Sequence, residues 1–128
     1  MTVRVALIVD DDVVLCELFS YAFRNANYET FVAHDVTQAF NLLHDNAIDV
    51  LLLDHSMPGT TGREMLQTIR DTSELQHLKV IMVTAEEGVM IDPCIQANTD
   101  LILLKPVSFS QLVQLASRLL STLSDDAL

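Results

Sequence analysis

Several polar residues of this chain stand directly after apolar runs, and their types suggest metal and phosphate chemistry. They follow four different runs: Asp10, Asp11 and Asp12, then Asp54, then Thr84, and finally Lys105. Crowded carboxylates raise one another's pKa unless a positive charge keeps them ionised. One lysine cannot balance so many carboxylates, whereas a hard divalent cation such as Mg²⁺, or Mn²⁺, binds carboxylate oxygens readily. A carboxylate beside such an ion, an ammonium and a hydroxyl could accept a phosphoryl group.

The apolar runs predict the elements that would bring these residues together. Five runs are short, rich in Val, Ile and Leu, and mostly unalternating: Val3–Val9, Thr30–Ala33, Ile48–Leu53, Val80–Val83 and Leu101–Leu104. This pattern indicates strands that are buried on both faces of a parallel sheet. Helical segments lie between them, so the order predicts an α/β, doubly wound (βα)5 fold. Ligands of such sheets bind at the carboxyl ends of the strands, where the polar residues stand.

Helix starts are indicated by side chains that can cap the first turn. Asp12 is expected to be the N-cap of the first helix. Pairs with capping-box spacing precede three further apolar faces: Asp35 with Gln38, Thr61 with Glu64, and Ser108 with Gln111. The fourth helix is predicted to be short, at about 93–97, with Asp92 as its N-cap and Pro93 in its first turn. A longer helix kinked at Pro93 is the alternative.

Composition limits the classes of function. A chain of 128 residues, half of them apolar, fits one globular domain. A net charge of −11 with seven scattered basic residues argues against direct nucleic-acid binding. No apolar run reaches the ~18–20 residues that cross a bilayer, and Val5–Val9 is too short for a signal peptide. We therefore expect a cytoplasmic protein with no membrane contact. Cys16 and Cys94 are expected to be buried free thiols, and the four histidines are expected to be structural.

Four motifs together resemble the receiver domain of two-component response regulators, the class that includes chemotaxis regulators. They are LIVDDD at residues 7–12, LLLDHSMPGTTG at 51–62, IMVTA at 81–85 and LLKP at 103–106. The resemblance covers essentially the whole chain. It implies a flavodoxin-like five-stranded sheet with strand order 2-1-3-4-5, and a single receiver domain at 1–128 with no output domain in this chain.

The resemblance also implies a role for each matching residue. Asp54 would be the phosphoacceptor, which attacks the phosphorus of a phosphohistidine on a sensor histidine kinase or a histidine phosphotransfer protein. Asp11 and Asp54 would bind Mg²⁺ directly, Asp10 mainly through water, and the backbone carbonyl of Ser56 would be a further ligand. The domain would catalyse its own phosphorylation and dephosphorylation and would not be an enzyme acting on other substrates.

Further residues are assigned on the same basis. Lys105 would pair with the phosphoryl group, and its bond to Pro106 is expected to be cis. Thr84 would hydrogen-bond the phosphoryl group and move towards it, while the small Ala85 leaves access open. Glu86 and Ser56 would set how long the phosphoryl group lasts.

The predicted output face departs from the family pattern. The switch residue of the fifth strand is usually aromatic and here is Ile102, so an aliphatic repacking would have to replace the aromatic flip. Ala97-Asn98-Thr99 stands where the family usually has Ala-Gly-Ala, and Val107 replaces a common Phe. The output partner is therefore unknown from the sequence, and a homodimer is possible.

Two other functions remain open. A pseudo-receiver would only bind a partner. A haloacid-dehalogenase-type phosphatase would use the DxDx[TV][LV] pattern that begins at Asp10, with Thr84 and Lys105 following in order. That family needs one more strand ending in an acidic pair after the lysine, and the only candidates, Asp125 and Asp126, follow a helix.

Overall fold

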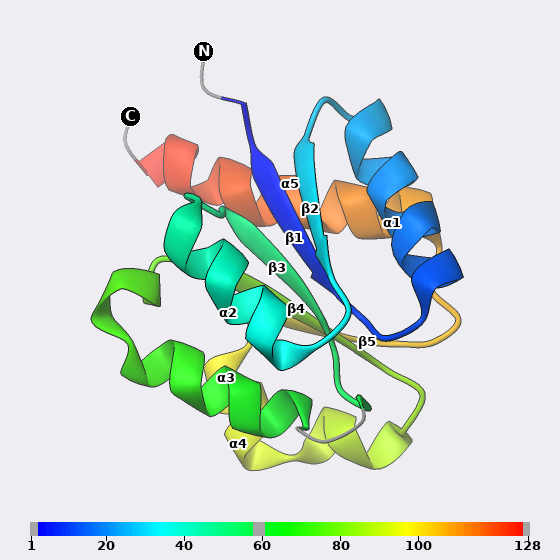
Figure 1. The fold of residues 1–128 in the computed structure, drawn as a ribbon, viewed down its shortest axis with the longest axis vertical. Coiled ribbons are helices and arrows are strands. Elements are labelled where there is room, and N and C mark those ends of the chain that lie inside the picture. Colours follow the sequence, from blue (N-terminus) through cyan, green and yellow to red (C-terminus); the bar gives the residue numbers. More distant parts are fainter. Residues whose placement is uncertain (1–2, 58–60, 127–128) are drawn as a thin grey trace.

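The five strands form one parallel sheet (Figure 1). The computed structural model describes residues 3–57 and 61–126; the predicted turn at Pro58-Gly59 lies outside them. The strands are β1 (Val5–Val9), β2 (Glu29–Ala33), β3 (Val50–Asp54), β4 (Lys79–Thr84) and β5 (Leu101–Leu104). Their order across the sheet is β2-β1-β3-β4-β5, and every neighbouring pair is parallel. The predicted flavodoxin-like topology is confirmed.

Helices cover both faces of this sheet. They are α1 (Val13–Asn25), α2 (Val36–Asp45), α3 (Gly62–Asp71), α4 (Pro93–Asn98) and α5 (Phe109–Asp126). Two short 3₁₀ helices, η1 (Ser73–Leu75) and η2 (Glu87–Ile91), precede β4 and α4. Among the residues that the structure describes, no helix is both long and apolar enough to cross a bilayer.

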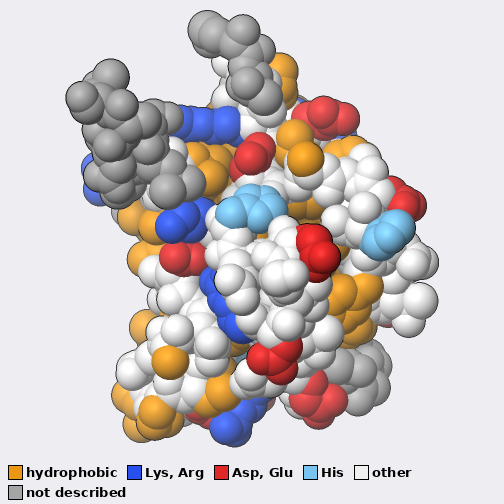
Figure 2. All heavy atoms as spheres, turned by 90° about the vertical axis from the view of Figure 1, so that its left-hand side faces the viewer, with side chains coloured by type: hydrophobic (Ala, Val, Ile, Leu, Met, Phe, Trp, Pro, Cys, Tyr) orange, Lys and Arg blue, Asp and Glu red, His pale blue; other side chains and the backbone are white. Residues whose placement is uncertain are grey.

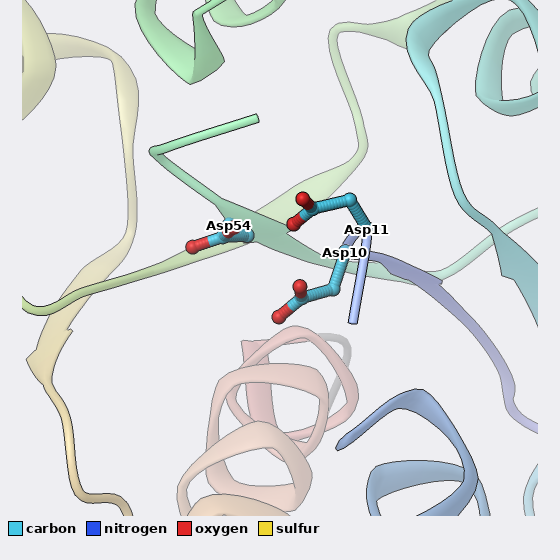
Figure 3. A group of neighbouring side chains, drawn as sticks. All are labelled: Asp10, Asp11 and Asp54. Carbon is cyan, nitrogen blue, oxygen red and sulfur yellow. The ribbon is translucent and has the colours of Figure 1, made fainter. Parts of the chain in front are cut away.

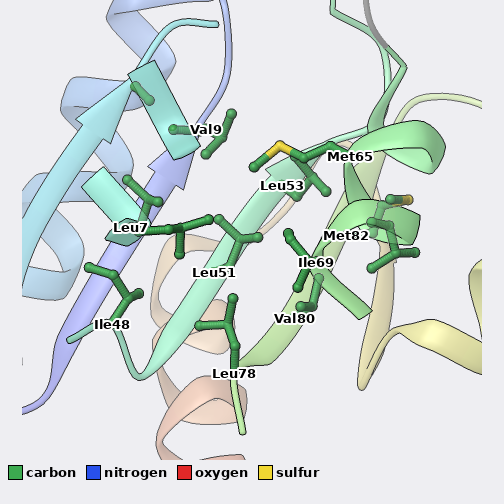
Figure 4. Packing of buried hydrophobic residues seen from close by; sticks show 14 of the residues in the cluster. Leu7, Val9, Ile48, Leu51, Leu53, Met65, Ile69, Leu78, Val80 and Met82 are labelled. Carbon is green, nitrogen blue, oxygen red and sulfur yellow. The ribbon is translucent and has the colours of Figure 1, made fainter. Parts of the chain in front are cut away.

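Two hydrophobic cores result, one on each face. Alternate strand residues such as Leu51, Leu53 and Met82 pack against α2, α3 and α4 (Figure 4). The residues between them, such as Leu52 and Ile81, pack against α1 and α5. All five residues of β3 are buried, because this strand lies at the centre of the sheet and has helices on both sides. Its last residue, Asp54, is therefore held on a rigid element.

The predicted helix starts are confirmed. Asp12 and Asp35 each accept a hydrogen bond from a backbone N–H of the first turn of α1 and α2. Thr61 and Ser108 cap α3 and α5 in the same way. Asp92 accepts from two backbone N–H groups at the start of α4, with Pro93 in its first turn, so the short-helix prediction holds. The connection between β4 and α4, which a short fourth helix leaves as a loop, contains η2.

A Schellman motif that the sequence analysis did not predict ends α1. Asn27 has a φ of 69°, in the left-handed region that Asn tolerates better than most residues. Its N–H donates to the Arg24 carbonyl, and the Tyr28 N–H donates to the Phe23 carbonyl. The rings of Phe23 and Tyr28 pack edge to face with centroids 4.9 Å apart. This turn sends the chain directly into β2.

Arg70, at the end of α3, ties three segments together. Its guanidinium donates to the backbone carbonyls of Asn98 (2.8 Å) and Leu78 (3.0 Å) and pairs with Asp100 at 3.5 Å. Asp100 also accepts from the Val80 N–H at 2.8 Å. These bonds join the ends of α3 and α4 to the starts of β4 and β5.

Charged side chains are mixed over the surface. On the face shown in Figure 2, basic side chains lie among acidic ones and do not form a continuous patch. Phosphate backbones of nucleic acids are bound by continuous basic surfaces. This face therefore lacks the surface that such binding requires.

Replacing Arg70 with Met should lower the free energy of unfolding by about 2 kcal/mol, because two carbonyls in part-buried contacts and Asp100 lose a charged donor. Urea denaturation followed by circular dichroism measures this change. Arg63→Met is the matched control: Arg63 is 55% exposed and pairs with Asp92 at 3.4 Å, so its loss should cost about 0.5 kcal/mol or less. Equal costs for the two variants would show that the Arg70 contacts do not stabilise the fold.

Candidate functional site

The polar residues singled out in the sequence meet at the carboxyl edge of the sheet. Asp10 and Asp11 directly follow β1, Asp54 ends β3, Thr84 ends β4 and Lys105 directly follows β5. Parallel pairing in register brings these four strand ends to the same side of the sheet. The structure thus brings these residues together at one edge of the sheet, as expected for a common site.

Three carboxylates form the centre of the site. One carboxylate oxygen from each of Asp10, Asp11 and Asp54 lies within 4.8 Å of the others. Figure 3 shows the side chains of Asp10 and Asp11 extending from the end of β1 towards Asp54 at the end of β3. Asp10 and Asp54 are buried (3% and 5% exposed), whereas Asp11 is exposed. Closely spaced oxygen donors of this kind are what Mg²⁺ prefers, so the residues fit such an ion.

Within residues 3–57 and 61–126, one ammonium group, that of Lys105, pairs with the two buried carboxylates. The Lys105 Nζ lies 3.2 Å from Asp54 Oδ1 and 3.6 Å from Asp10 Oδ2. The peptide bond from Lys105 to Pro106 is cis, as the resemblance implies. The lysine thus forms ion pairs with both buried acids.

The pKa values reflect this crowding. Burial raises the pKa of the Asp54 carboxyl above its ordinary value, although Lys105 opposes the shift. Burial also raises the pKa of Asp10; a hydrogen bond from the Asp12 N–H opposes this and the Asp54 charge adds to it. Burial alone would lower the pKa of Lys105, but the charges of Asp54 and Asp10 outweigh it and raise the value. Both buried acids are therefore costly to ionise without a further cation.

The remaining predicted polar residues, Thr84, Ser56 and Glu86, lie at or just after the ends of β3 and β4, beside the carboxylates. Thr84 is fully buried, and its Oγ1 accepts a hydrogen bond from the Glu86 N–H at 3.0 Å. Ser56 Oγ donates to Glu86 Oε1 at 3.3 Å, and His55 Nδ1 lies 3.4 Å from the same hydroxyl. Residues two positions after Asp54 and two after Thr84 are thus in direct contact.

Two predicted residues have other surroundings. Ala85 is exposed next to Thr84. Ile102 of β5 pairs with Met82 of β4. Its side chain is half-buried and packs against the core that contains Val89 and Ile95.

Two contacts of the site were missed by the sequence analysis. His34, expected to be a surface or helix-end residue, places Nδ1 3.1 Å from the Asp10 carbonyl oxygen. Cys16 is free and buried as predicted, and its Sγ donates to the same carbonyl at 3.2 Å. Burial and the neighbouring Asp10 charge raise the pKa of the Cys16 thiol to about 12, so the S–H persists. Cys94 is also free but only half-buried.

Gly62 also went unnoticed. At this position, the first residue of α3, a Cβ would come within 2.8 Å of the His55 Cα and 3.0 Å of the Asp54 carbonyl oxygen. The Gly62 N–H donates to the His55 carbonyl at 2.9 Å. Only glycine lets α3 begin this close to the backbone that carries Asp54. In the sequence, the only indication of this close approach is that a glycine directly follows the capping residue Thr61.

Comparison with known proteins identifies the family. The model of the response regulator receiver domain matches residues 6–117. The chain belongs to this family. Among the curated relatives of this receiver domain is the chemotaxis protein CheY of Pseudomonas aeruginosa, 40% identical over 81 residues, which are 62% of this chain and 65% of CheY. The phosphate regulon transcriptional regulatory protein PhoB of the same species is 32% identical over 115 residues, 88% of this chain. The receiver domain spans about half of PhoB.

Solved structures agree with the fold. A CheY-like receiver domain protein from Methanospirillum hungatei superposes with a TM-score of 0.88 over 98% of this chain and 99% of that one, at 21% identity. The response regulator TrrA from Thermotoga maritima, solved in complex with Mg²⁺-BeF, has a TM-score of 0.81 and 26% identity, covering 91% of this receiver domain and 98% of its own chain. The phosphatase alternative gains no support, since no strand follows β5 within residues 105–126.

The raised pKa of Asp54 gives a stability prediction for the metal-free protein. The folded state holds the Asp54 proton more tightly than the unfolded state, so this contribution to stability is complete below the ordinary aspartate pKa of about 3.9. It is lost as the pH rises through the raised folded value. Asp54→Asn should therefore increase the free energy of unfolding near neutral pH in EDTA, and the gain should shrink towards zero below about pH 4.

Urea denaturation at several pH values measures this difference. Glu17→Gln removes one charge from an exposed position of α1 and serves as the control, which should show no such pH-dependent gain. A destabilised Asp54→Asn variant at neutral pH would contradict the expectation.

Proposed function

We propose that this receiver domain accepts a phosphoryl group on Asp54 from a phosphohistidine, in a reaction that depends on Mg²⁺. The observation that carries the proposal is the convergence of Asp54 with Asp10, Asp11 and Lys105 at one edge of the sheet. Receiver domains of response regulators are phosphorylated by sensor kinases and pass signals to output domains. A sensor histidine kinase or a histidine phosphotransfer protein is the expected donor.

In the transfer step, one Asp54 carboxylate oxygen forms a bond to phosphorus while the bond from phosphorus to the donor imidazole breaks. The electron pair of that bond stays on the imidazole nitrogen, which takes up a proton. Lys105 already lies 3.2 Å from Asp54 and can transfer its ion pair to an oxygen of the arriving group. The buried strand β3 keeps the attacking carboxylate in place, which favours direct attack.

The donor set supports a divalent cation. Asp11 and Asp54 would hold Mg²⁺ directly, with Asp10 acting through water and the Ser56 carbonyl as a further ligand. When bound, the ion would offset the negative charge of the carboxylates and of the phosphoryl oxygens. The related TrrA, 26% identical, was solved with Mg²⁺-BeF bound, which supports this assignment.

The signal would begin at Thr84. Phosphorylation adds about −1.5 to −2 charges at the site, and the Thr84 hydroxyl would leave the Glu86 N–H to bond the new oxygens. Ile102 would then repack. Ile91 (76% exposed), Met90 and Leu104 are apolar side chains on this side of the protein, where an output partner or a second copy would bind.

The duration of the signal would depend on the contact between Ser56 and Glu86. Both side chains are exposed and meet at 3.3 Å, on the path that a hydrolytic water would take to the phosphoryl group.

We also propose that residues 1–128 form one receiver domain that works in the cytoplasm.

A direct test is to incubate the protein with acetyl phosphate and Mg²⁺. We expect a covalent adduct with the mass of one phosphoryl group, stable in acid and labile in alkali. It should be absent with EDTA and in Asp54→Asn, because the attacking oxygen is then lost. Intact-mass spectrometry measures the adduct.

Asp45→Asn, which alters an exposed aspartate of α2 that pairs with His44, is the matched control and should be labelled like the wild type. Steady hydrolysis of a phosphomonoester that requires Asp10 would contradict the proposal and favour a phosphatase. Absence of both the adduct and Mg²⁺ binding would favour a pseudo-receiver.

A further inference from the structure

The peptide bond between Asp10 and Asp11 is held by two side chains from outside β1. Its carbonyl oxygen accepts from His34 Nδ1 at 3.1 Å and from Cys16 Sγ at 3.2 Å. A carbonyl oxygen can only accept a hydrogen bond, so His34 Nδ1 must carry a proton in this contact. The two donors lie 3.8 Å from each other, and together they fix the direction of this carbonyl.

The rest of Asp10 is held as firmly. Its N–H donates to the Ala33 carbonyl at 3.1 Å, and its carboxylate accepts from the Asp12 N–H at 2.9 Å and faces Lys105. The pairing of Val9 with Ala33 brings the ends of β1 and β2 together. His34, the residue that follows β2, therefore lies next to Asp10, the residue that follows β1.

Asp11 is different. Its side chain is exposed, and the structure shows no hydrogen bond to its carboxylate among the described residues. The direction of that carboxylate therefore depends on the backbone, because a change in ψ of Asp10 that φ of Asp11 does not compensate would turn the peptide plane and the Cα–Cβ bond of Asp11 together. The Asp10–Asp11 plane is the one that His34 and Cys16 hold.

We propose that His34 is a positioning residue, which holds the Asp10–Asp11 peptide so that the Asp11 carboxylate stays within reach of a divalent cation shared with Asp54. This inference rests on the proposed Mg²⁺ site. His34 touches neither the ion nor the phosphoryl group. Groups that orient metal ligands in this way commonly contribute about 10- to 100-fold to metal affinity.

Two substitutions of similar size separate positioning from a general structural role. In His34→Asn the amide nitrogen can take the place of Nδ1, whereas in His34→Gln it extends further from the backbone. We expect His34→Asn to keep the wild-type dissociation constant for Mg²⁺ within about threefold and His34→Gln to weaken it about tenfold. Isothermal titration calorimetry with Mg²⁺ alone measures both, and His77→Gln, at an exposed histidine of the η1–β4 connection, should match the wild type.

A second readout needs no metal. The Asp11 N–H belongs to the held peptide plane, so its ¹H–¹⁵N resonance in EDTA should move in His34→Gln and stay near the wild-type position in His34→Asn. Equal Mg²⁺ affinities for the Asn and Gln variants, or an unmoved Asp11 resonance in His34→Gln, would overturn the inference while leaving the proposed function intact. A wild-type protein that binds no Mg²⁺ would overturn both.

Discussion

Two buried carboxylates share Lys105 beside a third, exposed carboxylate, and this imbalance of charge governs the site. Burial raises the pKa values of Asp10 and Asp54, and Lys105 offsets only part of the cost. An arrangement that is expensive in the absence of a cation is pre-formed to bind one, because ion binding recovers the energy that the fold has stored there.

The sheet makes this arrangement possible. A carboxylate can be kept in a low-exposure site only where its backbone cannot relax, and β3 lies between two strands and two layers of helices. Gly62 completes the constraint by allowing α3 to start against the backbone of Asp54 and His55. Packing along β3, in residues such as Leu51 and Leu53, thereby determines where Asp54 lies.

Most of the fold and the site could be predicted from the sequence, because both depend on local patterns. Unalternating apolar runs predicted both ends of every strand to within two residues, and capping side chains predicted five helix starts. The contact of His34 with Asp10 could not be predicted in this way, since it depends on the register of β1 with β2. Gly62 and the left-handed Asn27 were present as residue types, but their need for a special conformation appears only when neighbouring segments are placed.

If the domain is phosphorylated as proposed, the contacts of Arg70 and Thr84 indicate which part of the proposed output face would respond. Arg70 holds the end of α4 through the Asn98 carbonyl and the start of β5 through Asp100. The backbone of Thr84 is held in the sheet, whereas its hydroxyl has one hydrogen bond, from the Glu86 N–H. On the proposed function, a Thr84 hydroxyl that turned towards Asp54 would give up this bond, at the start of the segment that contains η2. A movement that started at Thr84 would therefore first reach η2, which lies near β5 and carries the buried Val89 and the exposed Ile91.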